Sequence, residues 1–229
     1  MGFCNTIIFM ESLNKYIEHT LLKQDATQEE LVKLLDEAIE HKFLGVCINP
    51  SNIKFTKEYL KNYSENTDIK IVTVVGFPLG ANKPEVKAFE AKLAVQDGAD
   101  ETDMVINVSL IKDKDFQAVQ EDIETVKAFC SDKPLKVILE TDLLTKEEIE
   151  IACSLCVKAK ADFVKTSTGF VKNGVGAKIE DVELMHKIVS PFGLEVKASA
   201  GIRDKQAAIN MIKAGASRLG TSAGVEIVQ

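Results

Sequence analysis

One module recurs along almost the whole chain: a short run of apolar, mostly β-branched residues, a polar or glycine-rich loop, and an amphipathic helix. Eight such runs stand about 23 to 35 residues apart, the span of one strand–helix unit. Strands separated by helices pair in parallel through right-handed crossovers. Eight units favour a closed α/β barrel, a single-domain (β/α)8 TIM barrel, over an open sheet. The expected strands are Tyr16–Thr20, Val46–Asn49, Lys70–Val75, Ala99–Val105, Leu135–Glu140, Ala161–Thr166, Leu194–Ala198 and Ser217–Gly220.

Helix boundaries can be read from the residues between these strands. Thr27 with Glu30, and Thr145 with Glu148, have the spacing of capping boxes at helix N-termini. A glycine stands just before several strands, where it can adopt the left-handed conformation that ends the preceding helix. These glycines are Gly45, Gly98, Gly193 and Gly215.

At 229 residues and 45% hydrophobic, the chain can bury a core of ordinary size, and no linker or low-complexity stretch divides it. We therefore expect an N-terminal extension, residues 1–11, followed by the barrel domain, residues 12–229. Met1–Thr6 matches a loose myristoylation pattern. The simpler interpretation is that the natural chain starts at Met10.

Charge and cysteine content restrict the class of partner. The formal net charge is −7 and no basic stripe stands apart from the acidic residues, which argues against a nucleic-acid partner. No apolar run approaches the roughly 20 residues of a membrane span. An odd count of five cysteines indicates a reduced, cytoplasmic setting. Cys153 and Cys156 fall on an apolar helical stripe, which favours core packing over a metal or redox site.

Two lysines and an aspartate stand at or near the carboxyl ends of expected strands, where barrel active sites are built. Lys165 and Lys197 belong to neighbouring strands, and Asp103 belongs to the fourth. Two ammonium groups about 5 Å apart repel by roughly 3 kcal/mol at an effective dielectric constant of about 20, equivalent to about two pKa units. One lysine can then be a neutral amine that attacks a carbonyl, while Asp103 transfers protons. The alternative for each lysine alone is a stem that extends to solvent at the barrel rim.

Small residues follow the sixth, seventh and eighth strands. The loops are 166–169, 199–201 and 220–224. The loops after strands seven and eight are the usual phosphate site of a barrel, so we expect a phosphorylated ligand.

At these residues the chain resembles the deoxyribose-phosphate aldolase family. The similarity runs from about residue 16 to the end in family order, which is more specific than any single motif. The matching stretches are His19–Lys23, Val46–Pro50, Val75–Gly80, Gly98–Asn107, Lys136–Thr141, Ala161–Phe170 and Val196–Arg203.

The resemblance implies reversible cleavage of 2-deoxy-D-ribose 5-phosphate to D-glyceraldehyde 3-phosphate and acetaldehyde, in deoxyribonucleotide catabolism, with no cofactor and no metal. Lys165 would form the Schiff base, Lys197 would lower its pKa, and Asp103 would be the acid/base. A homodimer is the expected assembly. Substrate and phosphate contacts would fall on Thr20, Cys47, Thr168, Gly169, Gly201, Gly220, Thr221 and Ser222, with core packing as the alternative for Cys47.

One departure from the family pattern bears on phosphate affinity. Ala200 stands where the family usually has the first glycine of a pair, so its methyl group is expected to crowd the phosphate. Two other functions stay open at this point. One is a Schiff-base barrel aldolase with another acceptor, of the transaldolase or keto-acid type. The other is a catalytically silent barrel that binds a sugar phosphate, although such a barrel needs none of the three charged residues.

Overall fold

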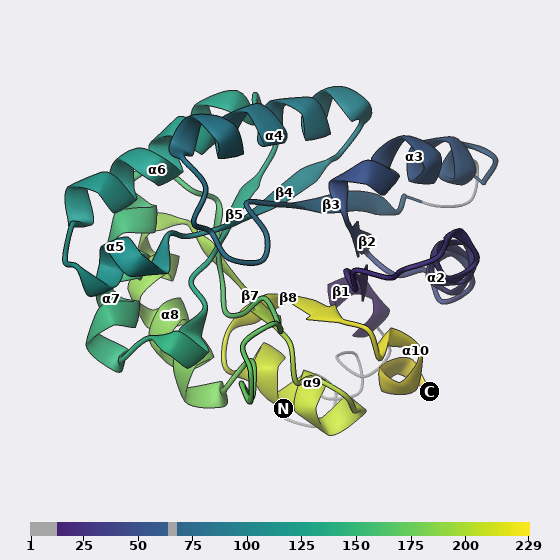
Figure 1. Cartoon of the computed structure of the whole chain (residues 1–229). Coiled ribbons are helices and arrows are strands. Elements are labelled where there is room, and N and C mark those ends of the chain that lie inside the picture. The colour runs from purple at the N-terminus through teal and green to yellow at the C-terminus, as the bar shows by residue number, and fades with distance from the viewer. Residues whose placement is uncertain (1–12, 64–67) are drawn as a thin grey trace.

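The computed structural model describes residues 13–63 and 68–229. Its strands form one closed parallel barrel in chain order, with β8 pairing back to β1, and the helices surround it (Figure 1). The predicted (β/α)8 architecture is confirmed. The strands are β1 (Ile17–Leu21), β2 (Gly45–Ile48), β3 (Lys70–Val75), β4 (Glu101–Val105), β5 (Leu135–Ile138), β6 (Phe163–Lys165), β7 (Glu195–Ser199) and β8 (Ala216–Thr221).

The helices follow the strands as the repeating module requires. The α-helices are α2 (Gln28–Glu40), α3 (Ile53–Lys61), α4 (Pro84–Asp97), α5 (Val108–Lys112), α6 (Phe116–Phe129), α7 (Lys146–Lys158), α8 (Ile179–Val189), α9 (Lys205–Lys213) and α10 (Gly224–Val228). The described part of the chain also holds four short 3-10 helices: η1 (Leu13–Tyr16), η2 (Pro50–Asn52), η3 (Thr141–Leu143) and η4 (Ser190–Phe192).

Both predicted capping boxes are present, at the starts of α2 and α7. Three of the four predicted glycines have left-handed backbones, for example Gly98 at φ 116° after α4. The prediction for Gly45 was wrong. Lys42 takes the left-handed conformation after α2, with φ 53°, and Gly45 is the first residue of β2. A glycine is needed there because a Cβ would lie 2.7 Å from the carbonyl oxygen of Lys70 on the next strand.

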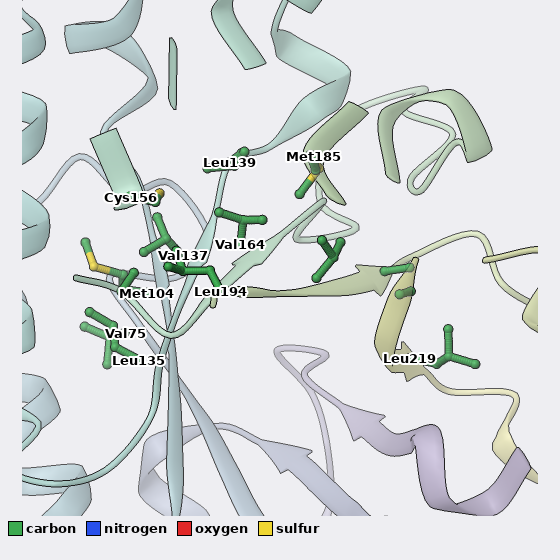
Figure 2. Close-up of a cluster of buried hydrophobic side chains, with 14 of the residues drawn as sticks. Val75, Met104, Leu135, Val137, Leu139, Cys156, Val164, Met185, Leu194 and Leu219 are labelled. Atoms are coloured by element: carbon green, nitrogen blue, oxygen red, sulfur yellow. The ribbon is translucent and has the colours of Figure 1, made fainter. Parts of the chain in front are cut away.

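The main hydrophobic core lies between the outside of the barrel and the helices. Outward-facing strand residues such as Val137 and Val164 are fully buried in it (Figure 2). Cys153 and Cys156 of α7 are fully buried in the same core, as the apolar stripe predicted. Helices such as α7 are therefore held by the apolar stripe that their sequence shows.

The inside of the barrel is charged, unlike the branched apolar layers usual in this fold. Alternation along the strands points Glu101 and Asp103 inward from β4, and Lys136 inward from β5. Asp103 and Lys136 are fully buried, as is Lys197 of β7. A buried charge is costly unless it is paired, so these groups must contact one another.

Several strand ends differ from the sequence-based expectation. Asp103 and Lys197 each lie two residues before the end of their strands, β4 and β7, whereas Lys165 is the last residue of β6. Glu140 lies outside β5, with a left-handed backbone at φ 61°. The expected extension, residues 1–11, lies outside the described residues. Within residues 13–63 and 68–229, no helix has the length and apolar character needed to cross a bilayer.

Candidate active site

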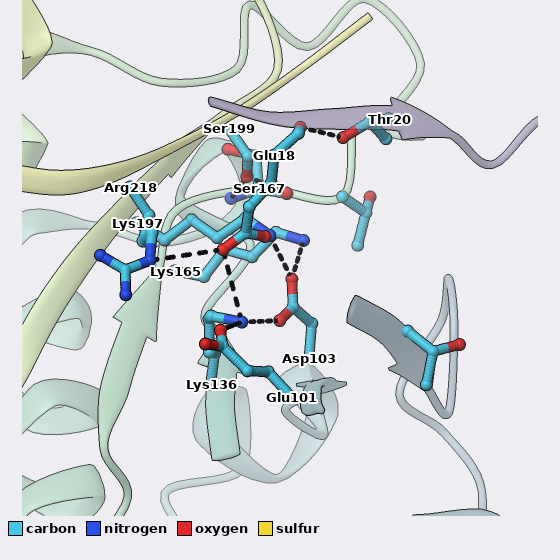
Figure 3. Close-up of polar contacts among 12 residues, drawn as sticks. Glu18, Thr20, Glu101, Asp103, Lys136, Lys165, Ser167, Lys197, Ser199 and Arg218 are labelled. Carbon is cyan, nitrogen blue, oxygen red and sulfur yellow. Dashed lines mark hydrogen bonds and ion pairs between the residues drawn. The ribbon is translucent and has the colours of Figure 1, made fainter. Parts of the chain in front are cut away.

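Asp103 accepts hydrogen bonds from both predicted lysines. Lys165 and Lys197 are register partners on β6 and β7. Their Nζ atoms donate to the same oxygen, Oδ2 of Asp103, at 2.7 Å and 2.6 Å (Figure 3). The two nitrogens are therefore at most about 5.3 Å apart. Lys165 is 3% exposed and Lys197 is fully buried, so Lys165 is the one that borders the cavity above.

A third lysine and two further carboxylates complete the cluster, and sequence reasoning did not assign them a role. Lys136 donates to Oδ1 of Asp103 at 2.9 Å, and its Nζ lies 2.6 Å from Oε2 of Glu101. Glu18 of β1 accepts from Lys197 and lies 3.5 Å from the Nζ of Lys136. A signal was available, because these charged residues stand at inward positions of buried strands, where an unpaired charge is costly.

The charges in this cluster fix its protonation. Burial alone would raise the pKa of Asp103, but the ammonium groups of Lys136, Lys165 and Lys197 hold it well below its usual range. Burial alone would lower the pKa of Lys197, but Asp103 and Glu18 raise it well above its ordinary value. Asp103 is therefore a carboxylate and Lys197 a cation at neutral pH. The sequence-based estimate did not include Glu18, whose negative charge offsets part of the repulsion between the lysines.

A cavity of about 410 Å³ opens above Lys165 at the carboxyl ends of the strands. Seven of the eight residues predicted to contact substrate or phosphate line it: Thr20, Thr168, Gly169, Gly201, Gly220, Thr221 and Ser222. Ser167 and Ser199 line the same cavity, in the loops 166–169 and 199–201 that the sequence indicated, although neither serine was assigned a contact of its own. Arg203 also lines it, and sequence reasoning gave it no role. The Oγ of Ser167 is buried with no hydrogen-bond partner among the described residues.

Cys47 is not brought to this cavity. Its side chain is fully buried in a small apolar cluster with Leu22, Val72 and Val74, and Phe77 packs against that cluster. Burial raises the pKa of the Cys47 thiol. The contacts thus favour the core-packing alternative for this residue.

Ala200 lies at the predicted place on the cavity wall. Its backbone is left-handed, with φ 66°, a conformation that favours glycine. The Cβ of Ala200 would lie 3.4 Å from a Cβ built on Gly169 of the opposite loop. The methyl group therefore narrows the part of the cavity between the two loops.

Among the described residues, no group of three or more His, Cys, Asp or Glu side chains is arranged to hold a metal ion. Residues 13–229 match the DeoC/LacD family aldolase. The chain belongs to this family. It is an aldolase, a carbon–carbon lyase, and the buried lysine–aspartate cluster lies where a barrel enzyme carries its active site.

Named relatives agree with this assignment. The aldolase is 54% identical to the deoxyribose-phosphate aldolase of Brevibacillus brevis, covering 95% of each chain. It is 52% identical to that of Thermococcus kodakarensis, covering 94% of this chain and 95% of the relative. Among solved structures, deoxyribose phosphate aldolase from Aeropyrum pernix, described as having a unique tetrameric structure, superposes with a TM-score of 0.83 at 32% identity, covering 96% of this chain and 90% of that one. The family supports aldol cleavage of a deoxyribose phosphate.

Proposed function

We propose that the aldolase cleaves 2-deoxy-D-ribose 5-phosphate reversibly to D-glyceraldehyde 3-phosphate and acetaldehyde through a Schiff base on Lys165. The observation that carries the proposal is that Lys165 and Lys197 share one oxygen of buried Asp103 beneath the cavity. A lone structural lysine needs neither a second lysine nor a shared carboxylate.

Lys165 is the nucleophile because it is the cluster lysine that borders the cavity. Its neutral amine attacks C1 of the open-chain sugar, and the carbinolamine loses water to give the imine. The hydroxyl on C3 then loses its proton and the bond between C2 and C3 breaks. Glyceraldehyde 3-phosphate leaves, and the electron pair of the broken bond forms an enamine. Protonation of the enamine and addition of water release acetaldehyde and regenerate Lys165.

Asp103 and Lys197 support these steps from below. Asp103 is a carboxylate that contacts the Lys165 amine, so it can take and return the protons of the carbinolamine and enamine steps. Lys197 remains cationic and favours loss of a proton from its neighbour, because two adjacent ammonium groups repel. Both roles are proposed from contact and charge.

The phosphate is proposed to bind at the other end of the cavity, against Gly169, Gly201 and the segment 220–222. The lining there is small and polar, and the cavity carries Arg203 at its rim. Small residues let backbone N–H groups approach phosphate oxygens closely.

Trapping with acetaldehyde and borohydride tests the proposal. Acetaldehyde and a lysine form an imine with loss of water, and hydride reduction leaves one ethyl group on the nitrogen. Peptide mapping is expected to find that group on Lys165, and to find none after Lys165→Ala. Ethylation confined to other lysines, in an enzyme that cleaves the sugar phosphate, would overturn the Schiff-base assignment.

The outer face of α4 bears on the assembly. A homodimer is supported by the outer face of α4, where the apolar residues Val86, Phe89 and Leu93 are 52%, 58% and 43% exposed at helical spacing. Light scattering of the purified chain tests it.

We further propose residues 12–229 as the catalytic domain. A cytoplasmic location is proposed because the described cysteines are free thiols. A role in deoxyribonucleotide catabolism is proposed because the substrate derives from deoxynucleotides.

A further inference from the structure

Glu140 is a buried carboxylate next to the active site that the proposed reaction does not use. It follows β5 and is 4% exposed. Its backbone is left-handed, at φ 61° and ψ 61°, a conformation that residues with a side chain seldom adopt. A costly backbone and a costly buried charge at one residue indicate that its side chain is needed in that position.

Both carboxylate oxygens of Glu140 are used on one residue of the neighbouring loop. Oε1 accepts from the backbone N–H of Thr168 at 3.1 Å, and Oε2 accepts from the hydroxyl of Thr168. The Thr168 hydroxyl oxygen in turn accepts from the backbone N–H of Phe170 at 3.0 Å. This series of hydrogen bonds fixes the residues on both sides of Gly169, which is a proposed phosphate contact.

Glu140 acts from outside the catalytic cavity. It lines an adjacent, more apolar cavity of about 490 Å³, together with residues such as Pro78 and Leu143. Thr168 and Phe170 line both cavities and so form part of the wall between them. Phe170 is also held by an edge-to-face contact with Phe77, with ring centroids 5.1 Å apart. Glu140 therefore meets the substrate only through the loop that it holds.

A neutral or shorter side chain would not reproduce this arrangement. Burial raises the pKa of Glu140, and the two hydrogen bonds from Thr168 oppose that rise. Both oxygens accept, and hydrogen bonds to an ionised carboxylate are stronger than neutral ones. Without the carboxylate, the N–H and hydroxyl of Thr168 would lose the acceptor that holds the loop in this conformation.

We propose that Glu140 is a positioning residue that sets the preference for phosphorylated sugars by holding the Thr168–Phe170 loop in its phosphate-binding conformation. The inference rests on the proposed function, since it concerns the phosphate end of that site. It goes beyond that function in assigning the preference to a residue that touches neither the sugar nor the phosphate.

The test compares kcat and KM for 2-deoxyribose 5-phosphate and for 2-deoxyribose in Glu140→Ala and Glu140→Gln. Asp162→Ala is the matched control. Like Glu140, Asp162 uses its carboxylate to accept from a backbone N–H of a neighbouring segment, that of Leu135 at 2.7 Å. It does so at the start of β5, at the opposite end of the barrel from the cavity. A purely structural role would lower activity on both sugars together.

For Glu140→Ala, we expect kcat/KM for the phosphorylated sugar to fall by roughly ten- to a hundredfold, mostly through KM. We expect the value for 2-deoxyribose to fall by less than about threefold, and acetaldehyde still to be trapped on Lys165. Glu140→Gln keeps one acceptor oxygen, so its preference for the phosphorylated sugar should lie between those of the wild type and Glu140→Ala. If the alanine variant does not fold, the glutamine variant tests the inference. Asp162→Ala should keep the full preference.

One result would overturn the inference: Glu140 variants that retain the wild-type preference for the phosphorylated sugar. They could do so with unchanged activity, or with an equal loss on both sugars of the kind expected for Asp162→Ala. Failure of the proposed function would look different, because the wild-type enzyme itself would show no cleavage, or no preference for phosphate, and both proposals would fall.

Discussion

Replacing Lys197 by leucine distinguishes the proposed role of Lys197 from that of Lys165. The variant keeps the proposed nucleophile, Lys165, and removes the cation that shares its Asp103 oxygen. At about 5.3 Å and an effective dielectric constant of about 20, the lost repulsion is about 3 kcal/mol. Glu18 loses its partner as well.

The assay is the pH–rate profile of aldol cleavage. Three kcal/mol corresponds to about two pH units, so the midpoint should move to higher pH by up to that amount. Activity near neutrality should fall by up to roughly a hundredfold and recover partly as the pH is raised. Loss of any direct contact between Lys197 and the substrate would add a part that pH does not rescue.

Stability needs its own measurement, because Lys197→Leu also leaves two carboxylates short of a partner. Removing one member of a buried pair costs about 3–5 kcal/mol. Asp103 and Glu18 raise the pKa of Lys197 well above the ordinary value of a lysine. Its stabilising contribution is therefore fully present below that ordinary value and is lost only as pH rises through the folded-state pKa. The stability loss is therefore constant near neutrality, while the activity loss varies with pH.

Lys87→Leu is the matched control. Lys87 is fully buried and donates to Asp122 at 2.7 Å, away from the cavity that borders Lys165. It should lose comparable stability and keep the wild-type profile. An unchanged midpoint in Lys197→Leu, or a borohydride adduct that moves off Lys165, would refute the roles assigned to the two lysines.

Three further predictions follow from the same site. Activity should be complete in excess chelator, and loss to EDTA with recovery on adding a divalent ion would contradict a lysine-based mechanism. Unphosphorylated 2-deoxyribose should be a much poorer substrate with part of the loss in kcat, because remote phosphate binding positions the reacting carbon; equal efficiency on both sugars would show that the small-residue loops are ordinary turns. Ala200→Gly should lower KM for the phosphorylated sugar, since it removes the methyl group that narrows the cavity. An unchanged KM would show that the methyl group does not contact the phosphate. The unfolding free energy of Ala200→Gly should change by less than about 1 kcal/mol, because relief of the left-handed backbone offsets the added freedom of the unfolded chain.

The local pattern determined the fold. Eight apolar runs alternating with capped amphipathic helices admit little besides a parallel barrel, because each helix must bury its stripe against the strand before it. The capping boxes at Thr27 and Thr145 depend on residues three apart and could be read directly. The assignment of Lys165, Lys197 and Asp103 to the sixth, seventh and fourth strands could also be read from the sequence, although the exact ends of several strands could not.

What surrounds those three residues was decided only by closing the barrel. Glu18 and Lys197 are 179 residues apart in the chain, and they meet because β8 pairs with β1 and carries β1 toward β7. No local spacing encodes that contact, and its carboxylate changes the charge balance that two lysines alone suggest. The same reason applies to Glu140, which the apolar pattern extended into a strand. Its backbone turns left-handed because the loop after the next strand supplies hydrogen-bond donors for its side chain, and such a preference is created by tertiary contact.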